Sequence, residues 1–158
     1  MESKRLVFRE LIMADVPRLF EIYSNEEAMK YRRSNPHKSM EDTFQMLRRD
    51  AEVKATKYEF RFGIIEKSTQ ELIGTIMYQP VYTKAIIGYS LDSNFWGKGY
   101  ATEVVEYFIN YLKKENFKLI EAWVMKENIA SSKVLLKNGF TKISQTIYPH
   151  SDFFKREI

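Results

Sequence analysis

The sequence contains no cysteine, which excludes a disulfide, a thiolate metal site and a cysteine nucleophile. Histidine is almost as scarce, since His37 and His150 are the only two, and we predict no metal site. No apolar run is long enough to cross a bilayer, and the first residues lack the apolar core of a signal peptide. The chain is therefore expected to be cytoplasmic and to have no membrane partner.

Length and charge narrow the class of protein further. The chain has 158 residues, a length typical of one domain, and we expect residues 1–158 to form it. A net charge of +4 allows an anionic ligand. The lysines and arginines are spread along the chain, however, and no strand combines aromatic and basic residues as RNA-binding modules do. Nucleic acid is therefore not an expected partner.

The hydrophobic pattern predicts an α/β fold with a mixed sheet. Asp15 and Ser39 are expected to cap the first two helices, and the second of these is predicted to bury Met40, Phe44, Leu47 and Ala51. The later helices are predicted over Gly99–Glu115 and Asn128–Asn138. The predicted strands are Arg5–Arg9, Glu59–Glu66, Leu72–Tyr82, Ala85–Leu91, Leu119–Val124, Thr141–Ile147 and Phe153–Ile158. The element order is then β-α-α-β-β-β-α-β-α-β-β, with a central βαβ unit over residues 85–124.

Residues 94–103 join the first strand of that unit to its helix, and they contain two glycines. Gly97 and Gly99 allow a tight turn and a close approach of a ligand to the backbone. The amides of Gly97, Lys98, Gly99, Ala101 and Thr102 are then donors at a helix N-terminus, which suits a pyrophosphate. The alternative is a glycine-containing turn before an ordinary helix. A nucleotide kinase loop fits poorly, because the Gly-Lys-Ser/Thr ending is missing.

A second informative segment covers residues 128–140. Asn128 is a predicted helix N-cap with Ser131 three residues later, and Gly139 stands where a helix C-terminus favours a left-handed residue. Together with Trp96-Gly97-Lys98-Gly99-Tyr100-Ala101, this segment resembles the GNAT superfamily of coenzyme-A-dependent N-acetyltransferases. Trp96 replaces the Arg or Gln of the general motif, and in this the chain resembles the branch that contains ribosomal-protein alanine and serine N-terminal acetyltransferases.

The resemblance implies acetyl-CoA as the co-substrate and a GNAT-like fold. In that family the two strands of the βαβ unit splay apart, and the pantetheine arm of the cofactor lies in the gap. The pyrophosphate is expected at residues 97–102, and Ser90, Leu91 and Asp92 are expected to offer backbone groups to pantetheine. The residues expected to bind the cofactor are Ser90, Leu91, Asp92, Trp96, Gly97, Lys98, Gly99, Tyr100, Ala101, Thr102, Asn128 and Ser131.

The implied reaction is direct attack of a primary amine on the thioester, without a covalent enzyme intermediate. Many family members place a tyrosine acid at the position of Leu135, which cannot donate a proton. Ser131 lies one helical turn away and is the nearest alternative. Asn128 is a candidate to hydrogen-bond pantetheine or to order a water. Glu103 is a candidate base, although a favourable interaction with the helix dipole explains it as well. The other candidates for the base are Asp92, Glu71 and Tyr89.

The acceptor site is expected in the segment between the first two helices, which covers that site in the resembled family. Tyr31, Arg32, Arg33 and Tyr89 are candidates to grip an acceptor peptide or carboxylate. The acceptor is expected to be an amine, either a protein N-terminus or a small molecule such as a polyamine, and the protein a monomer or homodimer. Because Leu135 replaces the tyrosine, a non-catalytic acyl-CoA-binding module is the alternative function.

Overall fold

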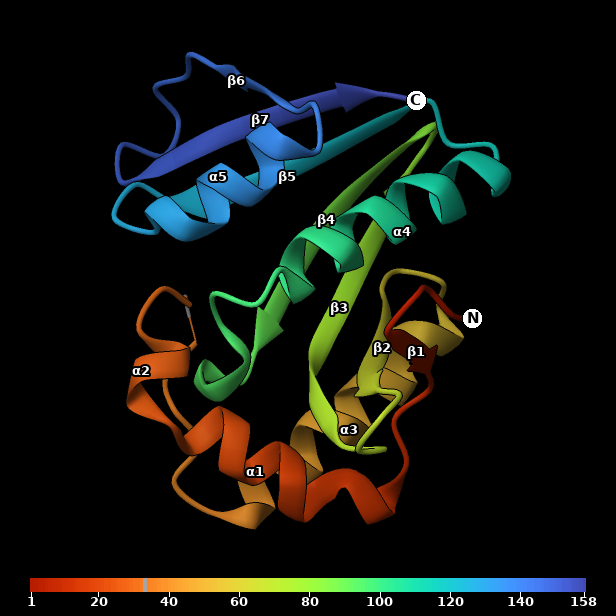
Figure 1. Ribbon diagram of the computed structural model, residues 1–158, viewed down its shortest axis with the longest axis vertical. Helices are drawn as coiled ribbons and strands as arrows, with labels where there is room; N and C mark the ends of the chain where they lie inside the picture. Colours follow the sequence, from red (N-terminus) through yellow and green to blue (C-terminus); the bar gives the residue numbers. More distant parts are fainter. Residues whose placement is uncertain (33) are drawn as a thin grey trace.

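The computed structural model describes residues 1–32 and 34–158, and its centre is a seven-stranded mixed sheet with the order β1-β2-β3-β4-β5-β7-β6 (Figure 1). Every neighbouring pair of strands is antiparallel except β4 and β5, which are parallel. The strands are β1 (Leu6–Arg9), β2 (Phe60–Glu66), β3 (Leu72–Val81), β4 (Lys84–Leu91), β5 (Leu119–Met125), β6 (Thr141–Ile143) and β7 (Ser151–Glu157).

Helices cover both faces of this sheet, so that two apolar clusters form. Successive residues of β2 point to opposite faces, and Ile64 packs in the cluster with α4 while Ile65 packs in the cluster with α1 and α3. Both isoleucines are buried. The helices are α1 (Val16–Ser24), α2 (Glu26–Met29), α3 (Met40–Ala55), α4 (Tyr100–Lys114) and α5 (Ile129–Lys137), with the 3₁₀ turns η1 (Met13–Asp15) and η2 (Ser93–Phe95).

The predicted element order is confirmed, and the differences are local. One short helix, α2, lies between α1 and α3, in the segment where the acceptor site is expected. Strand β6 covers only Thr141–Ile143 instead of reaching Ile147. The predicted apolar stripe of α3 is wrong at two positions, since Met40 and Ala51 are exposed while Thr43 and Leu47 are the buried residues.

The feature of the sheet that matters most for a ligand is the divergence of β4 and β5. Their parallel pairing begins at Lys84↔Leu119 and ends at Ile87↔Ala122. Beyond that point β4 continues to pair with β3, and β5 continues to pair with β7. The two strands spread apart toward the left of Figure 1. The splay expected from the resemblance is therefore present.

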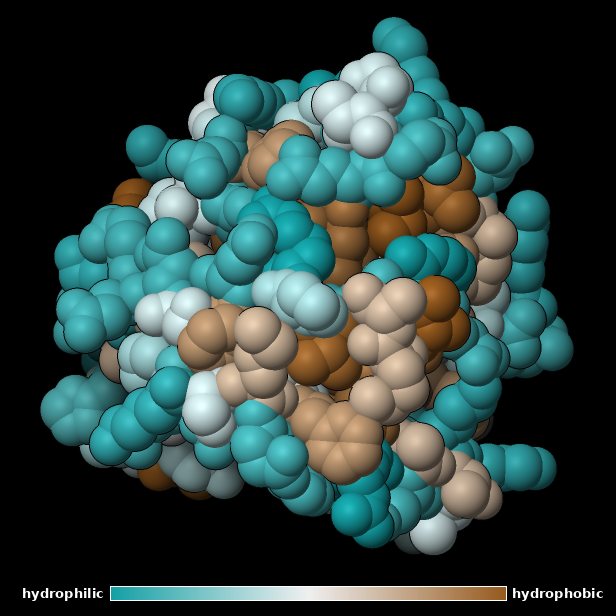
Figure 2. Space-filling view, turned by 90° about the horizontal axis from the view of Figure 1, so that it is seen from below, coloured by the Kyte–Doolittle hydropathy of each residue, from teal (hydrophilic) through white to brown (hydrophobic). Residues whose placement is uncertain are grey.

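The face of the molecule on the side of α1 is mainly hydrophilic (Figure 2). Figure 2 views the molecule from the side of α1 and shows apolar residues gathered near the middle of that face, surrounded by hydrophilic ones. Among residues 1–32 and 34–158, no helix has the length and apolar character needed to cross a membrane.

Candidate active site

The loop between β4 and α4 has the geometry of an anion site. Gly97 and Gly99 both have positive φ, +72° and +78°, a conformation that suits glycine far better than other residues. Gly99 is the N-cap of α4. The backbone N–H groups of residues 97–102 donate to no acceptor among the described residues. Nothing lies within 4 Å of the position that a Cβ of Gly97 would occupy. These amides are therefore open to a ligand at the positive end of the helix dipole.

Side chains from outside the loop hold it in this conformation. Nη1 of Arg5 donates to the carbonyl of Lys98 at 2.9 Å, and the Arg5 guanidinium lies over the ring of Tyr100 at 4.2 Å. Nζ of Lys98 donates to the Asn94 carbonyl at 3.0 Å. On the other side, Nε1 of Trp96 donates to the Leu91 carbonyl at 3.0 Å, which ties the loop to the end of β4. The loop is thus fixed before any ligand binds.

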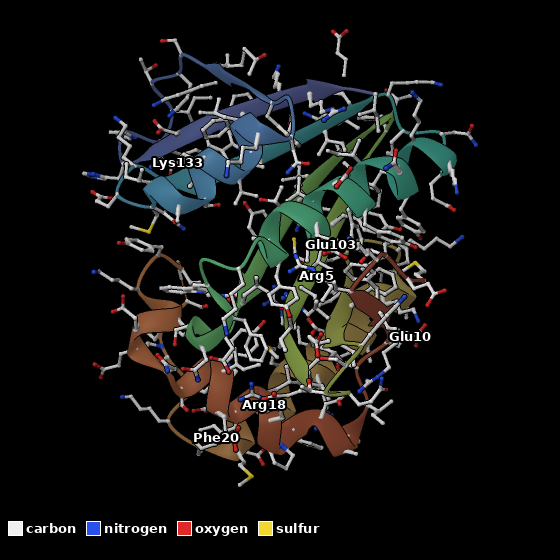
Figure 3. All side chains as sticks on the ribbon, in the orientation of Figure 1. Arg5, Glu10, Arg18, Phe20, Glu103 and Lys133 are labelled. Atoms are coloured by element: carbon white, nitrogen blue, oxygen red, sulfur yellow. The ribbon has the colours of Figure 1, made fainter. Side chains whose placement is uncertain are left out.

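Glu103, a candidate base, is hydrogen-bonded to Ser3 and to Arg5, which also holds this loop. Its carboxylate accepts hydrogen bonds from Ser3 Oγ at 2.7 Å, from the Arg5 amide at 2.7 Å and from Arg5 Nε at 2.6 Å. Figure 3 shows Arg5 and Glu103 next to each other. These bonds lower the pKa of Glu103 against the opposing effect of burial. Among the described residues, no hydrogen bond joins Glu103 to Asn128 or Ser131, the other two residues predicted to be catalytic.

Two further candidate bases, Asp92 and Glu71, are both paired with Arg18. Nη2 of Arg18 lies 2.5 Å from Asp92 Oδ2 and 2.8 Å from Glu71 Oε1. The other oxygen of Asp92 accepts from the amide of Asn94 at 2.9 Å and so caps η2. Figure 3 places Arg18 on α1, on the side of the sheet away from α5. Both carboxylates therefore join α1 to the sheet and to the start of the loop.

The backbone of β4 presents its groups to alternate edges. The Asp92 amide donates to the carbonyl of Ile73 in β3 at 2.8 Å. By the alternation of a strand, Ser90 shares that edge, whereas Tyr89 and Leu91 face the edge where β5 has diverged. Trp96 reaches the Leu91 carbonyl on this second edge. Of the three residues expected to offer backbone groups to pantetheine, Leu91 thus faces the gap, and Ser90 and Asp92 face β3.

A cavity of about 600 Å³ lies where β4 and β5 diverge. Five residues predicted for the site line it: Tyr31, Arg32, Tyr89, Asn128 and Ser131. Arg33, also predicted for the acceptor site, lies outside the described residues. Gly88 lines the cavity too, and it pairs with Met77 without a bulge. A shallower hollow of about 270 Å³ shares Arg32, Met125 and Ser151 with the cavity, which extends the concave surface toward His150.

On one wall of the cavity, a tyrosine and a serine are hydrogen-bonded. The Tyr89 hydroxyl lies 2.8 Å from Ser131 Oγ. Burial raises the pKa of Tyr89 to about 12, although the bond to Ser131 acts in the opposite direction. Tyr89 is therefore a protonated phenol at neutral pH. Asn128 Oδ1 accepts from the Ser131 amide at 3.1 Å, which confirms the predicted N-cap. Leu135 is fully buried in the core, so the phenol comes from β4 and not from α5.

The opposite wall holds charged residues that the sequence analysis missed. The Arg61 side chain is 11% exposed and pairs with two carboxylates, Asp50 at 2.9 Å and Glu59 at 3.0 Å. Nε2 of Gln79 also donates to Glu59, at 3.2 Å. Burial raises the pKa of Asp50, and Arg61 opposes this shift. One signal was available, because an arginine inside the apolar strand Glu59–Glu66 needs buried partners.

The sequence and the fold both have known relatives. Residues 5–141 match the family model described as an acetyltransferase (GNAT) domain. The chain is 32% identical to the uncharacterized N-acetyltransferase YoaA of Bacillus subtilis, over 90% of this chain and 82% of YoaA.

Two solved structures have the same fold. An acetyltransferase (GNAT family) from Bacillus anthracis aligns with a TM-score of 0.85 at 23% identity, covering 100% of this chain and 96% of that one. RimL, described as a ribosomal L7/L12 alpha-N-protein acetyltransferase in complex with coenzyme A, aligns with a TM-score of 0.85 at 19% identity, covering 99% and 96%.

Proposed function

The chain belongs to the GNAT family of acetyltransferases, and on this premise we propose how its own residues carry out the reaction. The protein is an acetyl-CoA-dependent N-acetyltransferase. The pyrophosphate of acetyl-CoA binds the amides of residues 97–102, with Gly97 and Gly99 keeping the loop open. The observation that carries this proposal is the position of the open amides at the end of β4, next to the divergence from β5.

The pantetheine arm then lies between β4 and β5. There it hydrogen-bonds to backbone groups of Tyr89 and Leu91 on the free edge of β4. The pantetheine arm thus takes the place that a neighbouring strand would occupy. The thioester reaches the cavity between the gap and the acceptor side, beside the Tyr89–Ser131 pair. An amide on this edge of β4 polarises the thioester carbonyl as charge develops on its oxygen.

The chemical step is direct attack by the amine nitrogen. A C–N bond forms to the acetyl carbon, the C–S bond breaks with its electron pair going to sulfur, and the amine loses a proton to water. The sulfur takes a proton from the Ser131 hydroxyl, which the Tyr89 phenol supports through their hydrogen bond. Solvent restores the proton to the pair. Because a thiol has a reference pKa of about 8.5, the thiolate needs only modest help to leave.

The acceptor that we propose is an α-amine, such as a protein N-terminus. Such an amine has a reference pKa of about 7.7–8.0, so a large fraction is uncharged at neutral pH without a strong base. Glu59 is the only carboxylate among the described residues that line the cavity, and Arg61 and Gln79 already engage it. RimL, which has the same fold, is described as acting on a protein N-terminus. A small-molecule amine is the alternative acceptor.

The proposal is tested first by calorimetric titration with acetyl-CoA, with ATP and NAD as controls. We expect acetyl-CoA to bind at micromolar concentration and the controls not to bind. Thiol release is then measured with an N-terminal peptide as the acceptor. Binding of acetyl-CoA without acceptor-dependent thiol release would favour a non-catalytic acyl-CoA-binding module. No binding of acetyl-CoA would overturn the assignment of the loop.

A further inference from the structure

The cavity is unevenly charged, and the excess is positive. Its charged lining residues are Arg32, Arg49, Arg61 and Glu59. Arg61 is compensated, because it pairs with both Glu59 and the partly buried Asp50. Arg32 and Arg49 have no carboxylate within 4.0 Å in the part of the chain that the structure describes. Two guanidinium groups on the acceptor side are thus available to a ligand.

Arg32 is held in place by an aromatic ring and not by an ion pair. Its guanidinium lies 4.8 Å from the centre of the Tyr23 ring. The Tyr23 hydroxyl is fixed by Thr75 Oγ1 at 2.6 Å, and the ring of His37 stacks on that of Tyr23 with the centres 5.1 Å apart. Such stacking orients a guanidinium and leaves N–H groups at its edge to bind an anion. Arg32 also lines both hollows and so stands where they join.

The pKa of the buried Tyr23 phenol is affected by the positive charge of Arg32. Burial alone raises the pKa of a tyrosine, yet the pKa of Tyr23 is lowered, because Arg32 and Arg61 oppose the effect of burial. The charge of Arg32, which forms no ion pair with the described residues, therefore acts on this phenol as well as on the cavity that Arg32 lines. A positive potential in a partly closed hollow concentrates anions and repels cations.

We propose that the acceptor is a primary amine that also carries an anionic group, a carboxylate or a phosphate, and that Arg32 and Arg49 bind this group. This inference rests on the proposed function and specifies its substrate class. Guanidinium groups suit either anion, because both accept two parallel hydrogen bonds from one arginine. A polyamine, which has only cationic groups, is excluded as the acceptor by the same charges. In a peptide acceptor, the anionic group would be an acidic side chain close to the N-terminus.

The test compares acceptors that differ in charge and little in shape. The coenzyme-A-loaded protein is titrated by calorimetry with Ala-Glu-amide and Ala-Gln-amide, and then with O-phosphoethanolamine and ethanolamine. We expect the anionic member of at least one pair to bind at least tenfold more tightly, which corresponds to about 1.4 kcal/mol. The first pair tests a carboxylate and the second a phosphate. Equal binding within both pairs would overturn the proposal.

Variants assign the effect to the two arginines. Arg32→Gln and Arg49→Gln should each reduce the preference for the anionic ligand at least threefold. Arg48→Gln is the matched control, since Arg48 is an exposed arginine of the same helix as Arg49 and does not line the cavity. An equal loss in Arg48→Gln would show a general charge effect and would overturn the assignment. Arg49 is exposed, so its variant remains informative if Arg32→Gln fails to fold.

Thiol release from acetyl-CoA with the same four compounds separates this inference from the proposed function. A preference in binding without thiol release supports an anion-binding acceptor cavity and contradicts the proposed transfer. Thiol release that is equal within both pairs, together with equal binding, supports the transfer and overturns the charge preference.

Discussion

At the scale of single residues, the conformation of Gly99 gives the most direct test of the cofactor loop. Gly99→Val places a β-branched side chain at φ +78°, which strains the backbone and displaces the amides that follow it. We predict that acetyl-CoA binding weakens at least tenfold, about 1.4 kcal/mol, while the fold survives. Calorimetric titration measures the affinity, and circular dichroism checks the fold.

Gly139→Val is a suitable control for this substitution. Gly139 has a similar φ, +73°, and in both glycines the nearest atom to an added Cβ is an arginine side-chain nitrogen. Gly139 lies after α5, however, and does not belong to the loop. We expect it to lose stability with no loss of acetyl-CoA affinity. An unchanged affinity in folded Gly99→Val protein would contradict the assignment of the pyrophosphate site.

The hydrogen bond between Tyr89 and Ser131 predicts coupled effects on turnover. Tyr89→Phe and Ser131→Ala should each lower kcat on the order of a hundredfold, the lower end of the range for general acid catalysis. Because the two hydroxyls act as one unit, the double variant should be no slower than the slower single variant. Single-turnover kinetics with acetyl-CoA measure this step.

Ser132→Ala is the matched control for the serine, because Ser132 is the next residue of α5 and does not line the cavity. It should retain full turnover. Multiplicative losses in the double variant would mean that Tyr89 and Ser131 act independently and would remove the phenol from the proton path.

Residue-level prediction from the sequence succeeds where the signal is local. Asn128, Ser131 and the two loop glycines lie within motifs of a few residues, and a cap or a tight turn depends only on neighbours in the chain. The contact of Tyr89 with Ser131 joins residues 42 positions apart. Arg49 and Arg61 meet the cavity because α3 packs against β2. The periodicity of a sequence does not predict that residues from separate elements line the same cavity.

At the scale of elements, the turn between β2 and β3 carries a pH-dependent contribution to stability. The Glu66 carboxylate accepts from Ser68 Oγ at 2.7 Å, the Thr69 amide at 2.8 Å and Thr69 Oγ1 at 2.9 Å. The hydrogen bond from Ser68 and those from Thr69 lower the pKa of Glu66 from 4.5 to about 2. A lowered pKa in the folded state means that the charged carboxylate stabilises the turn above about pH 4.5 and that this stabilisation is lost as pH falls toward 2.

We therefore predict that Glu66→Gln lowers the Tm at pH 7 and that the difference from the parent shrinks between pH 5 and pH 3. Thermal unfolding followed by circular dichroism measures both. Glu106→Gln serves as the control, since Glu106 is exposed on α4 and forms no ion pair with the described residues. A difference in Tm for Glu66→Gln that stays constant with pH would contradict the role given to its charge.

The α3 helix shows where element-level prediction reaches its limit. Ser39 was expected to cap it, and the capping box with Asp42 confirms this. The spacing of apolar residues predicted that Met40 and Ala51 are buried, yet Thr43 is buried instead. The Thr43 hydroxyl lies 2.9 Å from His37 Nδ1. Asp50 of the same helix is partly buried and pairs with Arg61 of β2. Polar residues with buried partners occupy positions that a hydrophobic pattern assigns to apolar ones.

At the scale of the whole molecule, the sheet consists of two parts that meet along a short seam. Strands β1–β4 form one part, strands β5–β7 form the other, and four residue pairs between β4 and β5 join them. A ligand in the gap contacts both parts. Since it binds only the folded state, it stabilises that state by mass action, about 2.7 kcal/mol at a concentration of 100 times its Kd.

We predict that acetyl-CoA at this concentration raises the Tm by about 5–10 °C for a chain of this size. Differential scanning calorimetry measures the shift, with ATP and NAD as controls. The shift should fall to about 1 °C in Gly99→Val at the same concentration if its affinity falls a hundredfold, because the stabilisation is then only about 0.4 kcal/mol. An equal shift with ATP would indicate a general polyphosphate site and not a coenzyme A site.

The overall fold was predictable because its elements are strongly periodic and because the central βαβ unit can only be parallel with a crossover helix. The glycine loop marks the ligand end of that unit in the sequence. The expectation that residues 1–158 form a single domain stays a prediction. The strand order β5-β7-β6 was not predictable, since the last strand inserts between two earlier ones and no local signal encodes that insertion.

The bonds from Ser3 and Arg5 to Glu103 and Lys98 have a consequence for experiments. They join the first residues of the chain to the cofactor loop, almost one hundred positions away. Energetic coupling is reciprocal, so a molecule that rigidifies the loop must also restrain the N-terminal residues. A fluorescent label at residue 1 or 2 would then report occupancy from outside the pocket. For the same reason, an affinity tag at the N-terminus would change the affinity of the loop for its ligand.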